Sequence, residues 1–257
     1  MQSPQNIIEV QHLKNNLGGK WVHKDVSFSV QRGEIIAIIG GSGCGKTTLL
    51  RSILQLLKPA AGIITVFGID VLKANEKKML AVQKRWGVLF QGGALFSSLT
   101  VLENVMYVLD EYATLSPAIK KELAFLKIAM SGLELEAAYK YPAELSGGMK
   151  KRAALARAIA LDPELIFLDE PTTGLDPKSA SDLDELILDM RKNLGLTFVM
   201  VTHDLETLRY VPDRVIFLGE GCVLADQPMA ELEKNTHPAI QSYFSGHRSK
   251  PECTAKV

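Results

Sequence analysis

A glycine-rich octet constrains this chain more than any other feature of its sequence. It fits the pattern G-x-x-x-x-G-K-[ST] at every fixed position, after an apolar run at residues 35–39 and before an expected helix. Glycines let backbone N–H groups turn around phosphate oxygens, and the N-terminus of a helix adds positive potential. The octet therefore predicts a phosphate-binding loop, whose residues with the next threonine are Gly40, Gly41, Ser42, Gly43, Cys44, Gly45, Lys46, Thr47 and Thr48.

Two side chains at the end of this loop suit the chemistry of a bound nucleotide. Lys46 has the reach to contact the β- and γ-phosphates, and the Thr47 hydroxyl is a suitable ligand for Mg²⁺. The alternative is an ordinary glycine-rich turn between a strand and a helix. The complete octet in its strand–helix setting favours phosphate binding.

Polar residues also follow two other apolar runs. Asp169 and Glu170 end the run at 165–168, and His203 comes shortly after the run at 197–201. A carboxylate at a strand end suits Mg²⁺, which favours Asp169, while Glu170 is placed to act as a general base on water. His203 would reach the same carboxyl edge of a parallel sheet. Acidic strand ends and surface histidines are common, so these assignments depend on the phosphate loop.

Helical patterns separate the apolar runs and predict a doubly wound α/β core. Asp176 starts one helix, which Gly195 ends, and Ser116 caps another. The stretch from about Gly92 to Ala143 is rich in helical pattern and has no obvious core strand. We therefore expect a helical insertion in the α/β core.

The composition describes a globular chain and excludes some classes of partner. Lys plus Arg and Asp plus Glu are 29 each among 257 residues, and this balance argues against nucleic acid as a partner. No apolar run approaches the roughly 20 residues of a membrane helix, and residues 1–10 lack the pattern of a signal peptide. Three scattered cysteines do not suggest a disulfide framework. We expect a cytoplasmic protein that reaches a membrane only through a partner.

The segment Leu145-Ser146-Gly147-Gly148-Met149 is the most discriminating one. It resembles the LSGGQ signature of ABC ATPases, and the residues that follow resemble the helix after that signature. A serine and two glycines that open a helix offer N–H groups and a hydroxyl to an anion. In the family, this site closes on the γ-phosphate of the ATP bound by a second subunit. The resemblance therefore implies a homodimer, in which Ser146, Gly147 and Gly148 contact the ATP of the partner copy.

Further motifs of the family follow in chain order, and the resemblance extends from about Ile7 to Gly246. Gln91 resembles the glutamine that senses Mg²⁺ and the membrane subunit, and residues 171–176 resemble the D-loop with its lead-in. The resemblance implies ATP and Mg²⁺ as cofactors, with the metal held by Thr47, Gln91 and Asp169. It implies catalytic roles for Glu170, His203, Lys46 and Gln91.

One feature of the family is missing. An aromatic residue that stacks on adenine is expected near Asn15, where the sequence has none. Asn16 and Trp21 are candidate substitutes, and packing within a strand is the alternative for Trp21. Base stacking is thus less well supported than phosphate binding.

The resemblance to ABC cassettes implies an α/β P-loop NTPase fold. This fold has a RecA-like core, an N-terminal antiparallel β subdomain and an α-helical subdomain inserted at about residues 92–160. We expect one ABC ATPase domain over residues 1–246 and a mobile C-terminal tail over residues 247–257.

Met149 and the stretch at 92–96 resemble the ATPases of MCE-type lipid transporters, the Mla systems of Gram-negative bacteria. This resemblance implies that the protein powers phospholipid movement between inner and outer membranes, and so maintains outer-membrane lipid asymmetry, from the cytoplasmic face of the inner membrane. The implied partners are an inner-membrane permease, a periplasmic MCE lipid-binding protein and a small STAS-domain protein. The main alternative is the ATPase of another ABC importer, for amino acids or amines. A non-transport ABC protein and a P-loop kinase fit less well, because the chain has one cassette and carries the LSGG segment.

Overall fold

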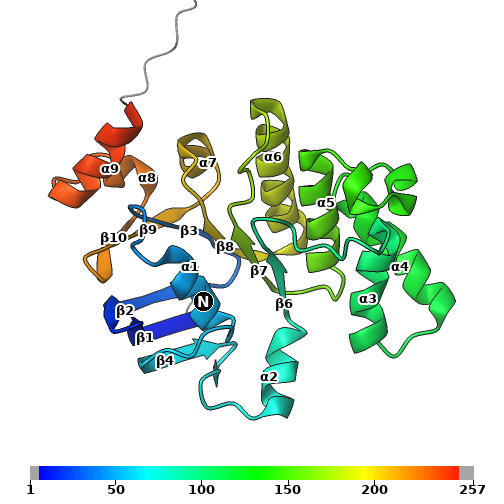
Figure 1. Cartoon of the computed structure of the whole chain (residues 1–257), viewed down its shortest axis with the longest axis horizontal. Helices are drawn as coiled ribbons and strands as arrows, with labels where there is room; N and C mark the ends of the chain where they lie inside the picture. The colour runs from blue at the N-terminus through cyan, green and yellow to red at the C-terminus, as the bar shows by residue number, and fades with distance from the viewer. Residues whose placement is uncertain (1–5, 249–257) are drawn as a thin grey trace, which may run out of the picture.

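The computed structural model describes the chain from residue 6 to residue 248, with side chains through Ser245. Within these residues, a single ten-stranded sheet has the order β5-β4-β1-β2-β10-β9-β3-β8-β7-β6 (Figure 1). The strands are β1 (Asn6–Leu17), β2 (Lys20–Gln31), β3 (Ile35–Ile39), β4 (Ala61–Val66), β5 (Ile69–Asp70), β6 (Trp86–Leu89), β7 (Leu165–Asp169), β8 (Thr197–Val201), β9 (Arg214–Gly219) and β10 (Cys222–Gln227).

The helices lie around this sheet and beyond its β6 edge (Figure 1). They are α1 (Lys46–Ile53), α2 (Glu76–Gln83), α3 (Val101–Tyr112), α4 (Pro117–Met130), α5 (Gly147–Ala158), α6 (Pro177–Leu194), α7 (Leu205–Tyr210), α8 (Met229–Leu232) and α9 (Pro238–Arg248). Two 3₁₀ turns, η1 (Leu135–Tyr139) and η2 (Pro142–Glu144), connect α4 to α5.

The sheet has an antiparallel part and a mainly parallel part. β1 pairs with β2 and β4 in antiparallel register, and β4 pairs with β5 in the same way. β9, β3, β8, β7 and β6 are parallel to one another, and β10 closes this part as an antiparallel neighbour of β9. Both the predicted α/β core and the predicted N-terminal antiparallel β region are therefore confirmed.

The central strands are buried on both faces, as their unbroken apolar sequences predict. Every residue of β3, β7 and β8 is buried. Along β3, Ile35, Ala37 and Ile39 belong to the core on the side of α5, α6 and α7, whereas Ile36 and Ile38 belong to the core shared with α1, β1 and β2. Because successive side chains of a strand point to opposite faces of the sheet, β3 contributes to both apolar cores.

The helical insertion has a core of its own, built mainly by α3, α4 and α5. Local sequence sets its boundaries, because Thr100 and Glu103 form a capping box at the start of α3, and the Ser116 hydroxyl accepts from the Ile119 N–H at the start of α4. The predicted limits of α6 are also confirmed, with Asp176 as N-cap and Gly195 in left-handed conformation (φ 67°) at its end. No strand occurs within the described insertion, as expected.

The C-terminal helix α9 packs back onto the core. The Tyr243 ring meets the ring of Phe217 in β9 edge to face, with 5.4 Å between centroids. α9 continues to Arg248, two residues into the stretch expected to be a tail, and the remainder of that stretch, 249–257, lies outside the described residues. The limits of a single domain at 1–246 stay a prediction. Between residues 6 and 248, no helix is both long and apolar enough to span a bilayer.

Candidate functional site

The predicted phosphate loop connects β3 to α1, as its sequence context requires. Gly40 and Gly45 have φ angles of 146° and 101°, which L side chains rarely adopt. A Cβ atom at Gly40 would lie 2.2 Å from the carbonyl oxygen of Leu218, so only glycine fits there. The Lys46 ammonium donates to the carbonyl oxygens of Gly40 (2.8 Å) and Gly41 (3.3 Å), which holds the cation against the loop.

The acid pair and the predicted histidine meet at the carboxyl ends of two adjacent parallel strands. Asp169 ends β7, and His203 follows β8. His203 Nδ1 lies 2.8 Å from Glu170 Oε2, and the Thr173 hydroxyl donates to the same oxygen at 2.9 Å. Glu170 has φ 51°, a left-handed conformation that costs energy for a non-glycine residue and is common at functional sites. The structure therefore brings Glu170 and His203 together, as the sequence predicts.

Asp169 is suited to a divalent cation. Its pKa is raised by burial and by the negative charge of Glu170, while Arg51 and Lys151 oppose this increase. Two neighbouring carboxylates, one of them buried, favour a compensating cation, and oxygen ligands suit Mg²⁺. The described residues contain no cluster of three or more His, Cys, Asp and Glu side chains that could hold a metal. A Mg²⁺ ion at Asp169 and Thr47 would therefore need phosphate oxygens as additional ligands.

The region around Gln91 is linked to the acid pair by a residue that the sequence analysis missed. Lys151 in α5 is 6% exposed, and its ammonium donates to the carbonyl oxygens of Gln91 and Glu170, at 2.7 Å each. Burial lowers the pKa of Lys151, and the charges of Glu170 and Asp169 oppose that decrease. Sequence offered no signal for this role, since the three segments are far apart in the chain. Gln91 itself is exposed and follows the end of β6, with Phe90 between them.

The signature segment lies at the start of α5, with Ser146 as its N-cap. The Ser146 hydroxyl accepts a hydrogen bond from the Met149 N–H at 3.2 Å, and Ser146 and Gly147 are exposed. Ser146 and Gly148 line a pocket with Ser179 and Asp182 of α6, and no phosphate-loop residue contributes to it. Within one chain, the signature and the phosphate loop therefore form separate surfaces.

The position expected for adenine stacking is not available to a base. Asn15 is 1% exposed, and its amide nitrogen lies 3.0 Å from both His23 Nδ1 and Ser52 Oγ. Asn16 is exposed and accepts a hydrogen bond from the Gly19 N–H at 2.9 Å. Trp21 is 49% exposed rather than packed within the sheet, and it lines a shallow pocket with Lys14 and Lys24.

Comparison with known proteins agrees with this geometry. The sequence profile described as "ABC transporter" matches residues 23–173. The intermembrane phospholipid transport system ATP-binding protein MlaF of Escherichia coli is 37% identical over 250 residues, which cover 97% of this chain and 93% of that protein. The MlaF of Haemophilus influenzae is 37% identical over 247 residues, with 96% and 93% covered. The probable ribonucleotide transport ATP-binding protein mkl of Mycobacterium tuberculosis is 35% identical over 244 residues, covering 95% of this chain and 68% of mkl.

Solved structures give the same result for the fold. The dimeric post-hydrolysis state of the ATP-binding cassette MJ0796, bound to ADP and Pi, has a TM-score of 0.79 and 30% sequence identity, and the match covers 86% of this chain and 98% of that one. CbiO1 from Clostridium perfringens, part of the ABC transporter complex cbiONQ, has a TM-score of 0.80 and 30% identity, with 90% and 91% covered. The phosphate loop, the acid pair with its histidine and the serine-capped signature helix therefore have a common explanation: the chain belongs to the ABC transporter family, as an ATP-binding cassette that hydrolyses ATP.

Proposed function

We propose that this cassette hydrolyses Mg-ATP at the edge formed by the phosphate loop, Asp169, Glu170 and His203, and that hydrolysis drives phospholipid transport between membranes. The contact of 2.8 Å between Glu170 Oε2 and His203 Nδ1 is the main support for Glu170 as the general base. It holds a carboxylate oxygen beside a second side chain that can accept or donate a proton. Lys46 and the loop N–H groups bind the phosphates, as do the hydroxyls of Thr47 and Thr48. Thr47, Asp169 and Gln91 would hold Mg²⁺, which would supply positive charge that neutralises the phosphates.

Each residue then has a defined part in hydrolysis. Glu170 orients the attacking water and accepts its proton, and His203 and Thr173 hold the Glu170 carboxylate in position. Ser146, Gly147 and Gly148 contact the γ-phosphate bound by a second copy, which explains why the signature is exposed in one chain. Hydrolysis removes the group that joins the two copies and so favours their separation.

The cargo assignment is supported by the two MlaF proteins, which are named for intermembrane phospholipid transport and match this chain along 93% of their length. The mycobacterial mkl proteins, named for probable ribonucleotide transport, give a second candidate cargo at 35% identity. This chain spans only 68% of mkl, so we favour phospholipid. We infer a position at the cytoplasmic face of the inner membrane, with a permease, a periplasmic MCE protein and a STAS-domain protein as partners.

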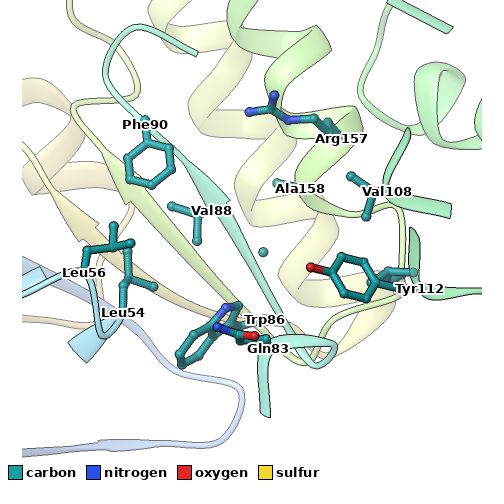
Figure 2. A pocket seen from close by; sticks show the side chains of 12 residues that line it. Leu54, Leu56, Gln83, Trp86, Val88, Phe90, Val108, Tyr112, Arg157 and Ala158 are labelled. Carbon is teal, nitrogen blue, oxygen red and sulfur yellow. The ribbon is translucent and has the colours of Figure 1, made fainter. Parts of the chain in front are cut away.

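A groove beside β6 is the proposed seat of the permease. It has a volume of about 310 Å³ and lies where the end of α1, β6, α3 and α5 approach one another. Figure 2 shows Leu54, Leu56, Trp86 and Val88 on one side of the opening, and Val108 and Tyr112 on the other. The strand that lines the groove leads through Phe90 to Gln91, and Lys151 links the Gln91 carbonyl to that of Glu170. An apolar helix of the permease in this groove would therefore contact the segment that leads to this link.

Affinity purification from membranes of the native host tests the cargo and the groove together. The tagged protein should recover a permease, an MCE protein and bound phospholipid, identified by mass spectrometry. Changing the exposed groove residues Leu56 and Tyr112 to Glu should abolish permease recovery without loss of ATPase activity. Leu80→Glu, at an exposed leucine of α2 outside the groove, is the matched control and should behave as wild type. Recovery of a nucleotide, amino-acid or amine transporter would overturn the phospholipid assignment, and permease recovery by the groove variant would overturn the docking site.

A further inference from the structure

Three buried polar side chains lie directly behind the phosphate loop. They are Asn15 in β1, His23 in β2 and Ser52 in α1, each at most 1% exposed. Asn15 Nδ2 lies 3.0 Å from His23 Nδ1 and 3.0 Å from Ser52 Oγ, and Ser52 Oγ lies 3.0 Å from the carbonyl oxygen of Thr48. Buried polar groups are costly unless hydrogen bonds satisfy them. The presence of three such side chains at one buried place therefore indicates that they have a role beyond packing.

The order of donors and acceptors fixes the tautomer of His23. The Ser52 hydroxyl has one hydrogen, and its shortest acceptor is the Thr48 carbonyl, whereas Asn15 Oδ1 lies farther away at 3.4 Å. Ser52 Oγ therefore accepts from one N–H of Asn15, and the other N–H of Asn15 points to His23 Nδ1. A neutral imidazole that accepts at Nδ1 carries its hydrogen on Nε2. His23 thus presents an N–H donor from its far side.

That donor faces the phosphate loop and has no hydrogen bond to any described residue. A Cβ atom at Gly45 would lie 2.4 Å from His23 Nε2, so the ring edge rests against the loop backbone. Burial lowers the pKa of His23, and a hydrogen-bond interaction with the Cys44 backbone opposes this decrease, as a carbonyl acceptor beside the ring would. His23 Nε2–H therefore points toward the Cys44 carbonyl, although the pair falls outside hydrogen-bond geometry in this structure.

We propose that His23 is a positioning residue of the phosphate loop, whose Nε2–H donates to the Cys44 carbonyl when the loop closes on phosphate. The C=O and N–H of a trans peptide point in opposite directions. A Cys44 carbonyl held toward His23 therefore turns the Gly45 N–H away from the ring and toward the bound phosphate. Asn15 contributes by fixing the tautomer, and Ser52 by orienting Asn15 and joining it to α1. This inference rests on the proposed ATP site.

Three substitutions at His23 separate this role from simple packing. The side-chain nitrogen of Gln can occupy the place of Nε2, and the amide of Asn can occupy the place of Nδ1. His23→Gln thus keeps the donor that faces the loop, His23→Asn keeps only the contact with Asn15, and His23→Leu fills the space without polar groups. The measurements are Mg-ATP affinity by calorimetry, thermal unfolding, and hydrogen–deuterium exchange of residues 40–48 with and without Mg-ATP.

We expect His23→Gln to bind Mg-ATP within about threefold of wild type, and His23→Asn and His23→Leu to bind at least about tenfold more weakly, because a buried acceptor then lacks its donor. The ATP-dependent protection of residues 40–48 should be lost in the same two variants. If all three variants bind Mg-ATP with the affinity of wild type, His23 contributes only to packing. Normal binding by His23→Asn with weak binding by His23→Gln would overturn the donor role. Failure of wild type to bind Mg-ATP would instead refute the proposed ATP site.

Discussion

The Lys151 ammonium donates a hydrogen bond of 2.7 Å to the main-chain carbonyl oxygen of Glu170, and a second bond of equal length to that of Gln91. One buried cation on the signature helix thus connects the proposed base to the segment that leads to the groove. A change in the position of the Gln91 segment would therefore be transmitted to Glu170 through α5, without any contact with nucleotide.

Replacement of Lys151 by Met should uncouple this connection. Two partly buried carbonyl oxygens would lose their donor, at a cost of at most about 1–3 kcal/mol each in the free energy of unfolding. We expect ATP turnover to fall at least about tenfold while Mg-ATP affinity changes little, measured by phosphate release and calorimetry. Lys151→Arg retains donors and is the control, with activity well above that of the Met variant. Wild-type turnover of Lys151→Met would show that the bonds serve stability alone.

Glu170→Gln should bind Mg-ATP but hydrolyse it very slowly. The amide keeps the shape of the side chain and removes its basicity, so the loss in turnover should be about 10²- to 10⁴-fold. With ATP present, the variant should also accumulate as a dimer, since the γ-phosphate contacted by both copies persists. Size-exclusion chromatography with light scattering measures this. Glu185→Gln, at an exposed position of α6, is the control, and full turnover of Glu170→Gln would remove Glu170 from the base role.

His203 and Thr173 should act on turnover through the same carboxylate oxygen, because both contact Glu170 Oε2. Thr173→Val removes a hydrogen bond to the Glu170 carboxylate and should lower turnover about 10- to 100-fold, corresponding to about 1.5–3 kcal/mol. His203→Ala should cost more. Since the two residues hold one group, the double variant should lose less than the product of the single effects. Fully multiplicative losses would show that the two residues act independently of each other.

The sequence predicted the parts of the site that are local in the chain. The phosphate loop, the acid pair and the Ser146 cap each have residues at fixed spacing, and buried parallel strands bring Glu170 and His203 to one edge, as apolar runs in adjacent βα units predict. The sequence did not predict Lys151 or the buried Asn15, because their partners come from distant segments. In the sequence, Asn15 stands only at the expected place of an aromatic residue, whereas the structure pairs β1 with β2 at this position and buries Asn15.

The last prediction concerns Asp184 of α6, a buried carboxyl away from the phosphate loop. It is 5% exposed, the Thr207 hydroxyl donates to its Oδ2 at 2.8 Å, and Oδ1 has no hydrogen bond to a described residue. Burial raises the pKa of Asp184 from 3.8 to about 6, against the hydrogen bond from Thr207. Between about pH 4 and pH 6 the folded state therefore binds more protons than the unfolded state, so stability falls as the pH rises through this range.

Asp184→Asn should remove this dependence on pH, because the amide is neutral throughout. The full difference between the two pKa values of Asp184 corresponds to roughly 3 kcal/mol, which is an upper limit for the gain in the free energy of unfolding at pH 7.5. We expect a gain of about 1–3 kcal/mol at pH 7.5 and almost none at pH 4, measured by urea unfolding at both values. Asp189→Asn, at an exposed position of the same helix, is the control. Equal stability of Asp184→Asn and wild type at pH 7.5 would mean that water or a neighbouring group solvates the Asp184 carboxylate in the folded protein.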